Sequence, residues 1–272
     1  MKKLIFILAL PLLFVACSME ENGPTDFNVL NNLPVDTGGV QSAFGLQSTN
    51  APYGFYAYTP GAYSADGPEY PLLVYLHGSE ETGNSTIDPA QLNKVLQSGP
   101  PMLIGKNNWY PTYPMVVVSP QSHEATWESD KIHDLITYLI DQYHVNTKRI
   151  YLTGCGIGGD GVLRYVRDYG EDSYVAACVP IDGISANNFS KIPTWMLRRN
   201  PEGGIAVNTS TKTKEKVNVL SPAQKVKIST YSEDGDNSWP ITNLDTEAGT
   251  ETIAVQALSQ SIYDWMFQYQ KD

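Results

Sequence analysis

A short stretch in the middle of the chain has the spacing of a motif that carries a nucleophile. Residues 154–159 read Gly-Cys-Gly-Ile-Gly-Gly, and an apolar run ends just before them. The motif G-x-S-x-G places a serine on a sharp turn between a strand and a helix, where its hydroxyl can attack a carbonyl carbon. In this chain the serine position is Gly156, so the spacing of the turn is present without a nucleophile.

Strand and helix patterns alternate around this stretch. Near-continuous apolar runs predict buried parallel strands, and apolar residues three and four apart predict helices. The predicted strands are Tyr53–Pro60, Tyr70–Gly78, Pro114–Pro120, Arg149–Gly154, Ala176–Asp182, Ile192–Leu197 and Val226–Tyr231, and the predicted helices are Ile132–Tyr143, Ile157–Tyr169 and Leu258–Tyr269. Of these strands, Tyr53–Pro60 alternates like an edge strand.

These elements predict an α/β fold with a mostly parallel central sheet and helices on both faces. Ligands of such sheets bind beyond the carboxyl ends of the strands. The stretch 154–159 follows one strand directly, so we expect it to lie at this ligand-binding edge.

Composition narrows the classes of partner. The chain has 272 residues, enough for one large domain, and its net charge is −11. That acidic balance excludes a nucleic-acid partner, because phosphates call for a basic face. No Cys-x-x-Cys or Cys/His spacing typical of a metal site is present, and the sequence predicts no cofactor.

The N-terminus has the pattern of a secretory signal. Lys2 and Lys3 precede an apolar run, Leu4–Val15, which is too short to span a bilayer. Ala16 before Cys17 resembles a bacterial lipobox, which implies cleavage before Cys17 and lipidation of its thiol. An ordinary signal peptide with an incidental cysteine remains the alternative.

The sequence therefore predicts three segments. Residues 1–16 are the lipoprotein signal peptide, residues 17–42 are the lipidated cysteine and a flexible polar tether, and residues 43–272 are the α/β domain. The expected location is the outer membrane of a Gram-negative bacterium, on either the cell-surface or the periplasmic face, with the lipid on Cys17 as the membrane anchor.

A family resemblance runs from about Tyr53 to Tyr269. Seven stretches carry it in order: "YPLLVYLHGSEETGN", "LNKVLQSGPPMLI", "VVVSPQ", "RIYLTGCGIGGDGVLRY", "IPTW", "DNSW" and "IYDW". Together they resemble α/β-hydrolases of the carboxylesterase and predicted-peptidase type, which include feruloyl and acetylxylan esterases. In that family a serine attacks the carbonyl, a later histidine takes its proton, and an acid orients the histidine.

The catalytic triad is degenerate when the family pattern is carried over position by position. The nucleophile position is Gly156, the histidine position is Asp236, and the acid position falls nearest Glu202. No histidine follows His144, so the usual histidine position is empty in any alignment of the C-terminal third. The resemblance implies that the backbone N–H groups of Ser79 and Ile157 form the oxyanion hole.

Five side chains are candidates for ligand binding at the same edge. His77 ends a strand, His123 and Trp127 follow another, Asp182 ends a third, and Trp239 lies in "DNSW". We expect the two tryptophans at the mouth of a cleft, where they can stack on a sugar ring or a phenolic group. Structural roles remain open for His77 and for both tryptophans.

Two cysteines remain after the N-terminal segment. Cys155 and Cys178 both fall in strand-like runs, which favours separate buried thiols over a disulfide. Cys155 precedes the apex of the turn and has no histidine in the usual position, so we do not expect it to act as a nucleophile.

The leading expectation is a catalytically inactive, esterase-like surface lipoprotein that binds a glycan or a glycan-linked ester in the former substrate cleft. Loss of two triad positions argues for inactivity, because losing a single member already costs several orders of magnitude in rate. One alternative is an active ester hydrolase or peptidase that uses His77, His123 and Asp236. Another is an interaction subunit of a surface complex. An oligosaccharide or an aryl ester is the expected ligand, and the sequence identifies no protein partner.

Overall fold

The computed structural model describes residues 26–184, 191–199, 226–232, 243–246, 249–252 and 262–272. The predicted site residues Glu202, Asp236 and Trp239, and the predicted anchor Cys17, lie outside these ranges. Ten strands are found in the described part: β1 (Val40–Phe44), β2 (Gly54–Thr59), β3 (Tyr70–Leu76), β4 (Val116–Gln121), β5 (Val145–Cys155), β6 (Val175–Ile181), β7 (Trp195–Arg199), β8 (Lys227–Ser232), β9 (Asn243–Thr246) and β10 (Gly249–Thr252).

Helices fill the connections between these strands. They are α1 (Asn28–Asn31), α2 (Gly99–Gly105), α3 (Ser129–Gln142) and α4 (Ile157–Tyr169), with 3-10 segments η1 (Ser79–Glu81), η2 (Pro89–Gln97) and η3 (Gly170–Asp172). Residues 262–266 form a further helical turn near the C-terminus. None of the described helices is long and apolar enough to cross a membrane.

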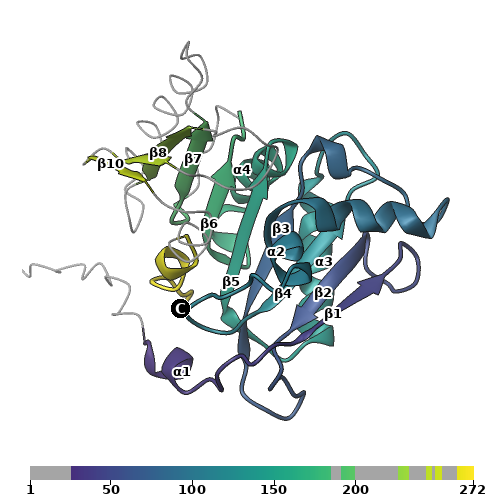
Figure 1. The fold of residues 1–272 in the computed structure, drawn as a ribbon, viewed down its shortest axis with the longest axis horizontal. Helices are drawn as coiled ribbons and strands as arrows, with labels where there is room; N and C mark the ends of the chain where they lie inside the picture. The colour runs from purple at the N-terminus through teal and green to yellow at the C-terminus, as the bar shows by residue number, and fades with distance from the viewer. Residues whose placement is uncertain (1–25, 185–190, 200–225, 233–242, 247–248, 253–261) are drawn as a thin grey trace, which may run out of the picture.

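The strands form one sheet in the order β1-β2-β4-β3-β5-β6-β7-β8-β9-β10 (Figure 1). The central strands, from β4 to β8, run parallel, and the strands at both margins pair antiparallel. The predicted α/β fold with a mostly parallel sheet is therefore confirmed.

Helices cover both faces of this sheet. Tyr75 and Leu76 are neighbours on β3, so their side chains point to opposite faces. The Tyr75 ring packs against Gly99 at the start of α2, whereas Leu76 Cδ1 lies 3.1 Å from where a Cβ on Gly161 of α4 would be. It follows that α2 and α4 lie on opposite faces.

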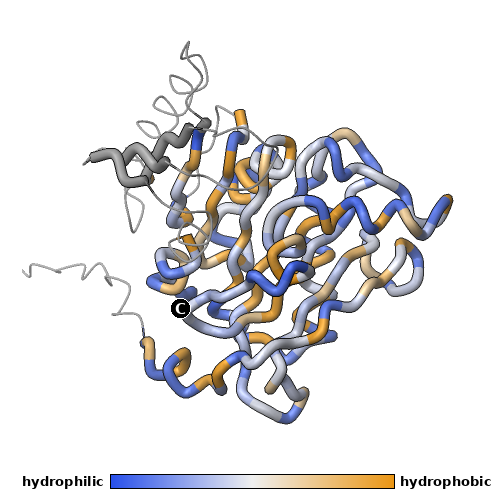
Figure 2. Tube along the Cα trace, in the orientation of Figure 1, coloured by the Kyte–Doolittle hydropathy of each residue, from blue (hydrophilic) through white to orange (hydrophobic). Residues whose placement is uncertain are grey.

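The core lies along the central strands. Every residue of β3, β4 and β6 is buried, as the near-continuous apolar runs predict. Figure 2 shows these strands as a largely orange and white centre, with hydrophilic segments around it. This buried sheet is a rigid base for the turn at Gly156, because β5 runs through its middle.

The N-terminal segment corrects the predicted domain boundary. Within the predicted tether 17–42, residues 26–42 pack on the domain, because Leu30 and Leu33 are 1 % and 8 % exposed. The Asp36 carboxylate accepts hydrogen bonds from the Tyr58 hydroxyl and from a backbone N–H in a neighbouring turn. The domain thus includes residues from Asp26 onward, and β1 rather than the predicted strand 53–60 forms the edge of the sheet.

Candidate functional site

The turn between β5 and α4 keeps the backbone of a nucleophile-bearing turn. Gly156 has φ 57° and ψ −116°, a conformation that residues with a side chain rarely adopt. Its N–H donates to the Ile181 carbonyl at 2.9 Å, and its carbonyl accepts from the Asp160 N–H at 3.0 Å. The turn is therefore fixed to β6 on one side and to the first turn of α4 on the other.

The three glycines of the motif have different physical roles. A Cβ on Gly154 would lie 2.7 Å from the Leu76 carbonyl oxygen, and a Cβ on Gly158 would collide with the same oxygen. Among the described residues, a Cβ on Gly156 would have no heavy atom within 4 Å, its own chain neighbours aside. The flanking glycines are therefore required for close packing, while the apex has open space at the position where the motif places its serine.

The loop after β3 is held by a buried histidine. His77 is fully buried, and its Nε2 accepts the Ser122 backbone N–H at 2.9 Å. Nδ1 therefore carries the proton, which it donates to the Gly78 carbonyl at 2.6 Å. Burial lowers the pKa of His77 to about 4. The prediction that His77 binds ligand is thus corrected, because both ring nitrogens are occupied and the ring is out of reach.

Further hydrogen bonds fix the same loop to its surroundings. The side-chain amide of Gln121 donates to the backbone carbonyls of Glu81 and Gln91, at 3.0 and 2.5 Å. Lys94 Nζ donates to the Thr82 carbonyl at 3.0 Å. This loop contains Ser79, whose N–H is one of the two predicted oxyanion-hole donors, so the backbone there is preorganised.

Trp127 is part of this support and not of a cleft mouth. Its side chain is 1 % exposed, and its Nε1–H donates to the His77 carbonyl at 3.2 Å. The His77 and Trp127 rings meet edge to face with centroids 4.9 Å apart. The predicted exposure of Trp127 is therefore wrong: α4 packs on the indole at Gly161, where a Cβ would lie 2.6 Å from Trp127 Cβ.

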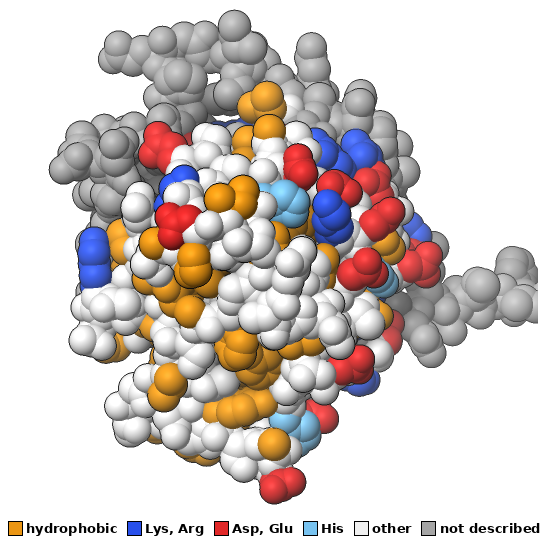
Figure 3. All heavy atoms as spheres, turned by 90° about the vertical axis from the view of Figure 1, so that its right-hand side faces the viewer, with side chains coloured by type: hydrophobic (Ala, Val, Ile, Leu, Met, Phe, Trp, Pro, Cys, Tyr) orange, Lys and Arg blue, Asp and Glu red, His pale blue; other side chains and the backbone are white. Residues whose placement is uncertain are grey.

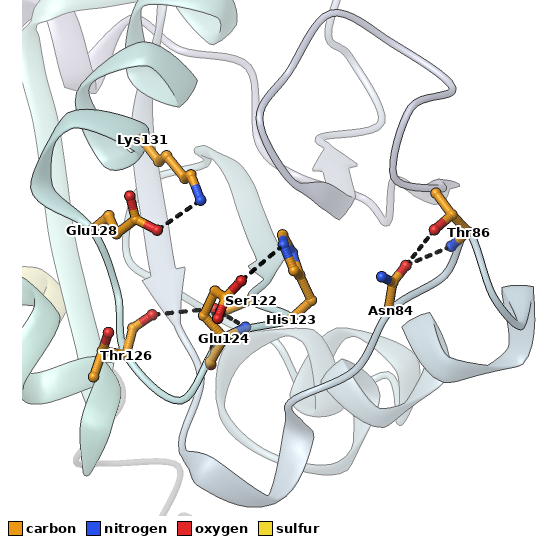
Figure 4. A network of polar contacts seen from close by, with 8 residues as sticks. All are labelled: Asn84, Thr86, Ser122, His123, Glu124, Thr126, Glu128 and Lys131. Atoms are coloured by element: carbon orange, nitrogen blue, oxygen red, sulfur yellow. Dashed lines mark hydrogen bonds and ion pairs between the residues drawn. The ribbon is translucent and has the colours of Figure 1, made fainter.

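His123 remains accessible on the loop that follows β4. Its side chain is 27 % exposed, and Nε2 lies 3.4 Å from Glu124 Oε1 (Figure 4). The Ser122 hydroxyl shapes this loop by accepting from the Glu124 N–H at 3.1 Å and contacting the Thr126 carbonyl at 3.3 Å. His123 is thus a candidate for contact with ligand, but its nearest acid is a neighbour in the chain.

Asp182 lies beside the turn, as its position after β6 predicts. Cys155 pairs with Ile181 in the sheet, which places the next residues, Gly156 and Asp182, side by side at the carboxyl edge. Asp182 has φ 51°, and its N–H donates to the Leu197 carbonyl at 3.0 Å. The structure thus brings together Gly156, Ile157 and Asp182 at one edge.

A buried carboxylate at this edge was missed from the sequence. Glu81 is 7 % exposed, and its Oε1 accepts the Ser98 hydroxyl at 2.5 Å. The Ser98 oxygen also lies 3.0 Å from the Tyr75 hydroxyl. The preceding residue, Glu80, is exposed, and the sequence contains no signal that distinguishes the two adjacent glutamates.

Cys155 and Cys178 are separate thiols that form no disulfide, as predicted. Cys178 is fully buried, which raises its pKa to about 12. Its Sγ lies 3.3 Å from the Thr194 hydroxyl. Cys155 is half-buried. Within the described ranges, no three His, Cys, Asp or Glu side chains converge as a metal site.

Comparison with known proteins gives matches among solved structures only. No protein-family model and no curated protein matches the chain. A thermostable esterase matches over 87 % of this chain with a TM-score of 0.55 and 20 % identity, and the chain spans 64 % of that esterase's length. A feruloyl esterase module from Clostridium thermocellum, complexed with sinapinate, matches over 90 % of this chain and 92 % of its own length, with a TM-score of 0.49 and 15 % identity. A ferulic acid esterase has a TM-score of 0.48 at 11 % identity, covering 84 % of this chain and 95 % of its own.

The match to the thermostable esterase, at 20 % identity, supports the fold of this chain. The mostly parallel sheet of this chain, with helices on both faces, fits the fold indicated by that match. The chain therefore has an α/β-hydrolase fold.

Proposed function

We propose that this chain is a pseudo-hydrolase: an esterase-type shell that binds its ligand without cleaving it. One observation carries the proposal. Gly156 keeps the backbone conformation of the nucleophile-bearing turn, has no described heavy atom within 4 Å of where a Cβ would lie, its chain neighbours aside, and offers no hydroxyl or thiol there. The oxyanion hole has nothing to stabilise without a group that attacks the carbonyl.

Burial of His77 weakens the alternative of a rebuilt active site. A general base at neutral pH needs a reachable nitrogen and a pKa near the working pH. His77 has neither, because both nitrogens are hydrogen-bonded inside the protein and burial lowers its pKa to about 4.

The proposed ligand is a glycan or a glycan-linked ester in the former substrate site. The resemblance to feruloyl and acetylxylan esterases supports this class by analogy. The charge of the molecule agrees with a neutral ligand: net charge is −11, and acidic side chains gather along one margin of the face drawn in Figure 3. Such a surface repels polyanions.

The proposed location is the outer membrane, through a lipid on Cys17. The lipobox-like "FVAC" ahead of a polar, acidic segment supports it. Cys17→Ala should release the protein from the membrane fraction of an expressing Gram-negative cell. Cys155→Ala, which changes a thiol inside the domain, should leave it membrane-bound; release of both variants, or of neither, would contradict the anchor.

The test of inactivity is ester hydrolysis by purified Ser18–Asp272. We expect nitrophenyl acetate and methyl ferulate to be hydrolysed no faster than in buffer. The variant Gly156→Ser/Asp236→His restores the nucleophile and the histidine of the family pattern and should gain turnover. Its matched control is Gly156→Ala/Asp236→His, which lacks only the hydroxyl and should stay inactive. Turnover by the native protein that is lost in His123→Ala would disprove the proposal.

A further inference from the structure

Glu81 is the deeply buried carboxylate of the described site, and only one of its two oxygens accepts a hydrogen bond from a described residue. Its Oε1 accepts the Ser98 hydroxyl at 2.5 Å, while Oε2 has no hydrogen-bond partner among the described residues. A buried carboxylate oxygen without a donor is costly, so an approaching donor group gains free energy at this atom.

The free oxygen lies beside the turn at Gly156. A methyl group built on Gly78 would lie 3.3 Å from Glu81 Oε2 and 3.6 Å from the Cys155 carbonyl oxygen. Among the described residues, the two chain neighbours of Gly78 aside, no other heavy atom lies within 4 Å of that point. The Cys155 carbonyl belongs to the peptide bond that leads into Gly156, so this open point lies next to the apex.

Both oxygens that face this point are hydrogen-bond acceptors. Carboxylate and backbone carbonyl oxygens accept hydrogen bonds, so they attract O–H or N–H groups and repel the oxygens of an ester or a carboxylate. The Ser98 hydroxyl on Oε1 fixes the direction of the carboxylate, and the Glu81 backbone carbonyl accepts from Gln121 Nε2 at 3.0 Å. The two acceptor oxygens are thus preorganised to bind a hydrogen-bond donor.

We propose that Glu81 Oε2 binds a hydroxyl group of a saccharide ligand, in the open space beside Gly78. The ligand then enters the former oxyanion region by a hydroxyl and not by an acyl oxygen. This inference rests on the proposed function and selects one of its two ligand classes: an unesterified glycan rather than the ester linkage itself. Neighbouring hydroxyls of one sugar ring can donate to both acceptors.

Two variants test the subsite in different ways. Glu81→Gln keeps the shape and one oxygen for Ser98 but turns an amide donor toward the ligand. Gly78→Ala places a methyl group at this point, in tight contact with Oε2 at 3.3 Å, and Gly78 has φ −78°, a backbone conformation that alanine adopts without strain. The matched control is Glu69→Gln, the same chemical change on an exposed residue just before β3, at its opposite end.

The experiment is isothermal titration calorimetry of Ser18–Asp272 with xylotetraose, cellotetraose and ferulate. We expect at least one tetrasaccharide to bind, with affinity reduced about tenfold or more in Glu81→Gln and in Gly78→Ala and unchanged in Glu69→Gln. Thermal melting confirms that each variant is folded, and if one fails to fold the other decides.

The outcomes separate this inference from the proposed function. Tetrasaccharide binding that neither variant weakens overturns the role of Glu81 and leaves the pseudo-hydrolase proposal standing. Binding of ferulate without either tetrasaccharide overturns the choice of ligand class. Ester hydrolysis by the native protein overturns inactivity, and the titrations then still decide whether Glu81 holds a hydroxyl.

Discussion

At the scale of single residues, the backbone at Gly156 explains why glycine suits a turn that has lost its nucleophile. A side chain at φ 57° and ψ −116° costs free energy, which an enzyme tolerates for the sake of its serine. Glycine adopts this conformation without that cost. Under the proposed function, glycine in place of the serine removes the nucleophile and relieves the strain in one step.

This account predicts the stability of three alanine variants. Gly156→Ala should lower the free energy of unfolding by about 1–3 kcal/mol, because the new Cβ meets no atom but the backbone is strained. Gly170 has nearly the same dihedral angles, φ 52° and ψ −125°, with equally open space, so Gly170→Ala should lose a similar amount. Urea unfolding measures both.

The control for that comparison is Gly105→Ala, at the end of α2, where φ is not positive and the nearest atom to a new Cβ is 3.9 Å away. It should be neutral or slightly stabilising. A large loss in Gly105→Ala, or none in Gly156→Ala, would show that backbone strain is not the deciding term.

At the scale of elements, the loop from β3 to η1 is fixed by contacts that do not depend on catalysis. The His77 ring accepts a hydrogen bond from the segment after β4, and the Trp127 indole donates to the His77 carbonyl. The Gln121 side chain donates to the Glu81 carbonyl in the same loop. These contacts hold the loop in place without any contribution from a catalytic triad. They also place Glu81 with its carboxylate inward.

The His77 contact predicts a stability change with pH. Its pKa is about 4 in the folded protein against 6.5 ordinarily, so the unfolded chain takes up a proton first as the pH falls. Stability from this group is complete above pH 6.5 and declines by about 3 kcal/mol as the pH falls to about 4.

Urea unfolding of His77→Gln beside the native protein measures this contribution. The variant lacks the titrating ring, so its loss of stability between pH 6.5 and pH 4 should be smaller by about that amount. Nitrogen NMR should show a neutral His77 ring at pH 5.5 in the folded native protein. A charged ring at that pH would contradict the assignment of Nε2 as an acceptor.

At the scale of the whole molecule, Arg149 joins the two ends of the described domain. Its guanidinium is 1 % exposed and donates to the Asp26 carbonyl at 2.7 Å, the Phe267 carbonyl at 3.0 Å and Gln270 Oε1 at 2.8 Å. Arg149 lies near the start of β5, and the candidate site lies at the other end of the same strand. Figure 1 draws α1 and the C-terminus below and α4 above.

Arg149→Met should therefore loosen both ends together. Buried carbonyls left without a donor cost roughly 1–3 kcal/mol each, so we expect a loss of roughly 2–4 kcal/mol in urea unfolding. Hydrogen exchange should accelerate in α1 and near Phe267. Lys148→Met, which changes an exposed neighbour, should change neither the stability nor the hydrogen exchange. Protection of α1 that survives in Arg149→Met would contradict the proposal that Arg149 joins the two ends.

The sequence by itself determined the fold class, the helix 157–169 and the missing nucleophile. Periodicity reports which elements form, and the identity of residue 156 is read directly. Only the tertiary structure decided which side chains face the site. His77 and Trp127 are at the right edge but turn inward, and Glu81 takes a place that the sequence did not indicate. The physical reason is that contacts between residues distant in sequence fix the backbone of a loop. That backbone then sets the direction in which the side chains of the loop point. Leu30 and Leu33 illustrate the same limit, because a polar segment with two leucines joins the core only where the fold offers a surface for them.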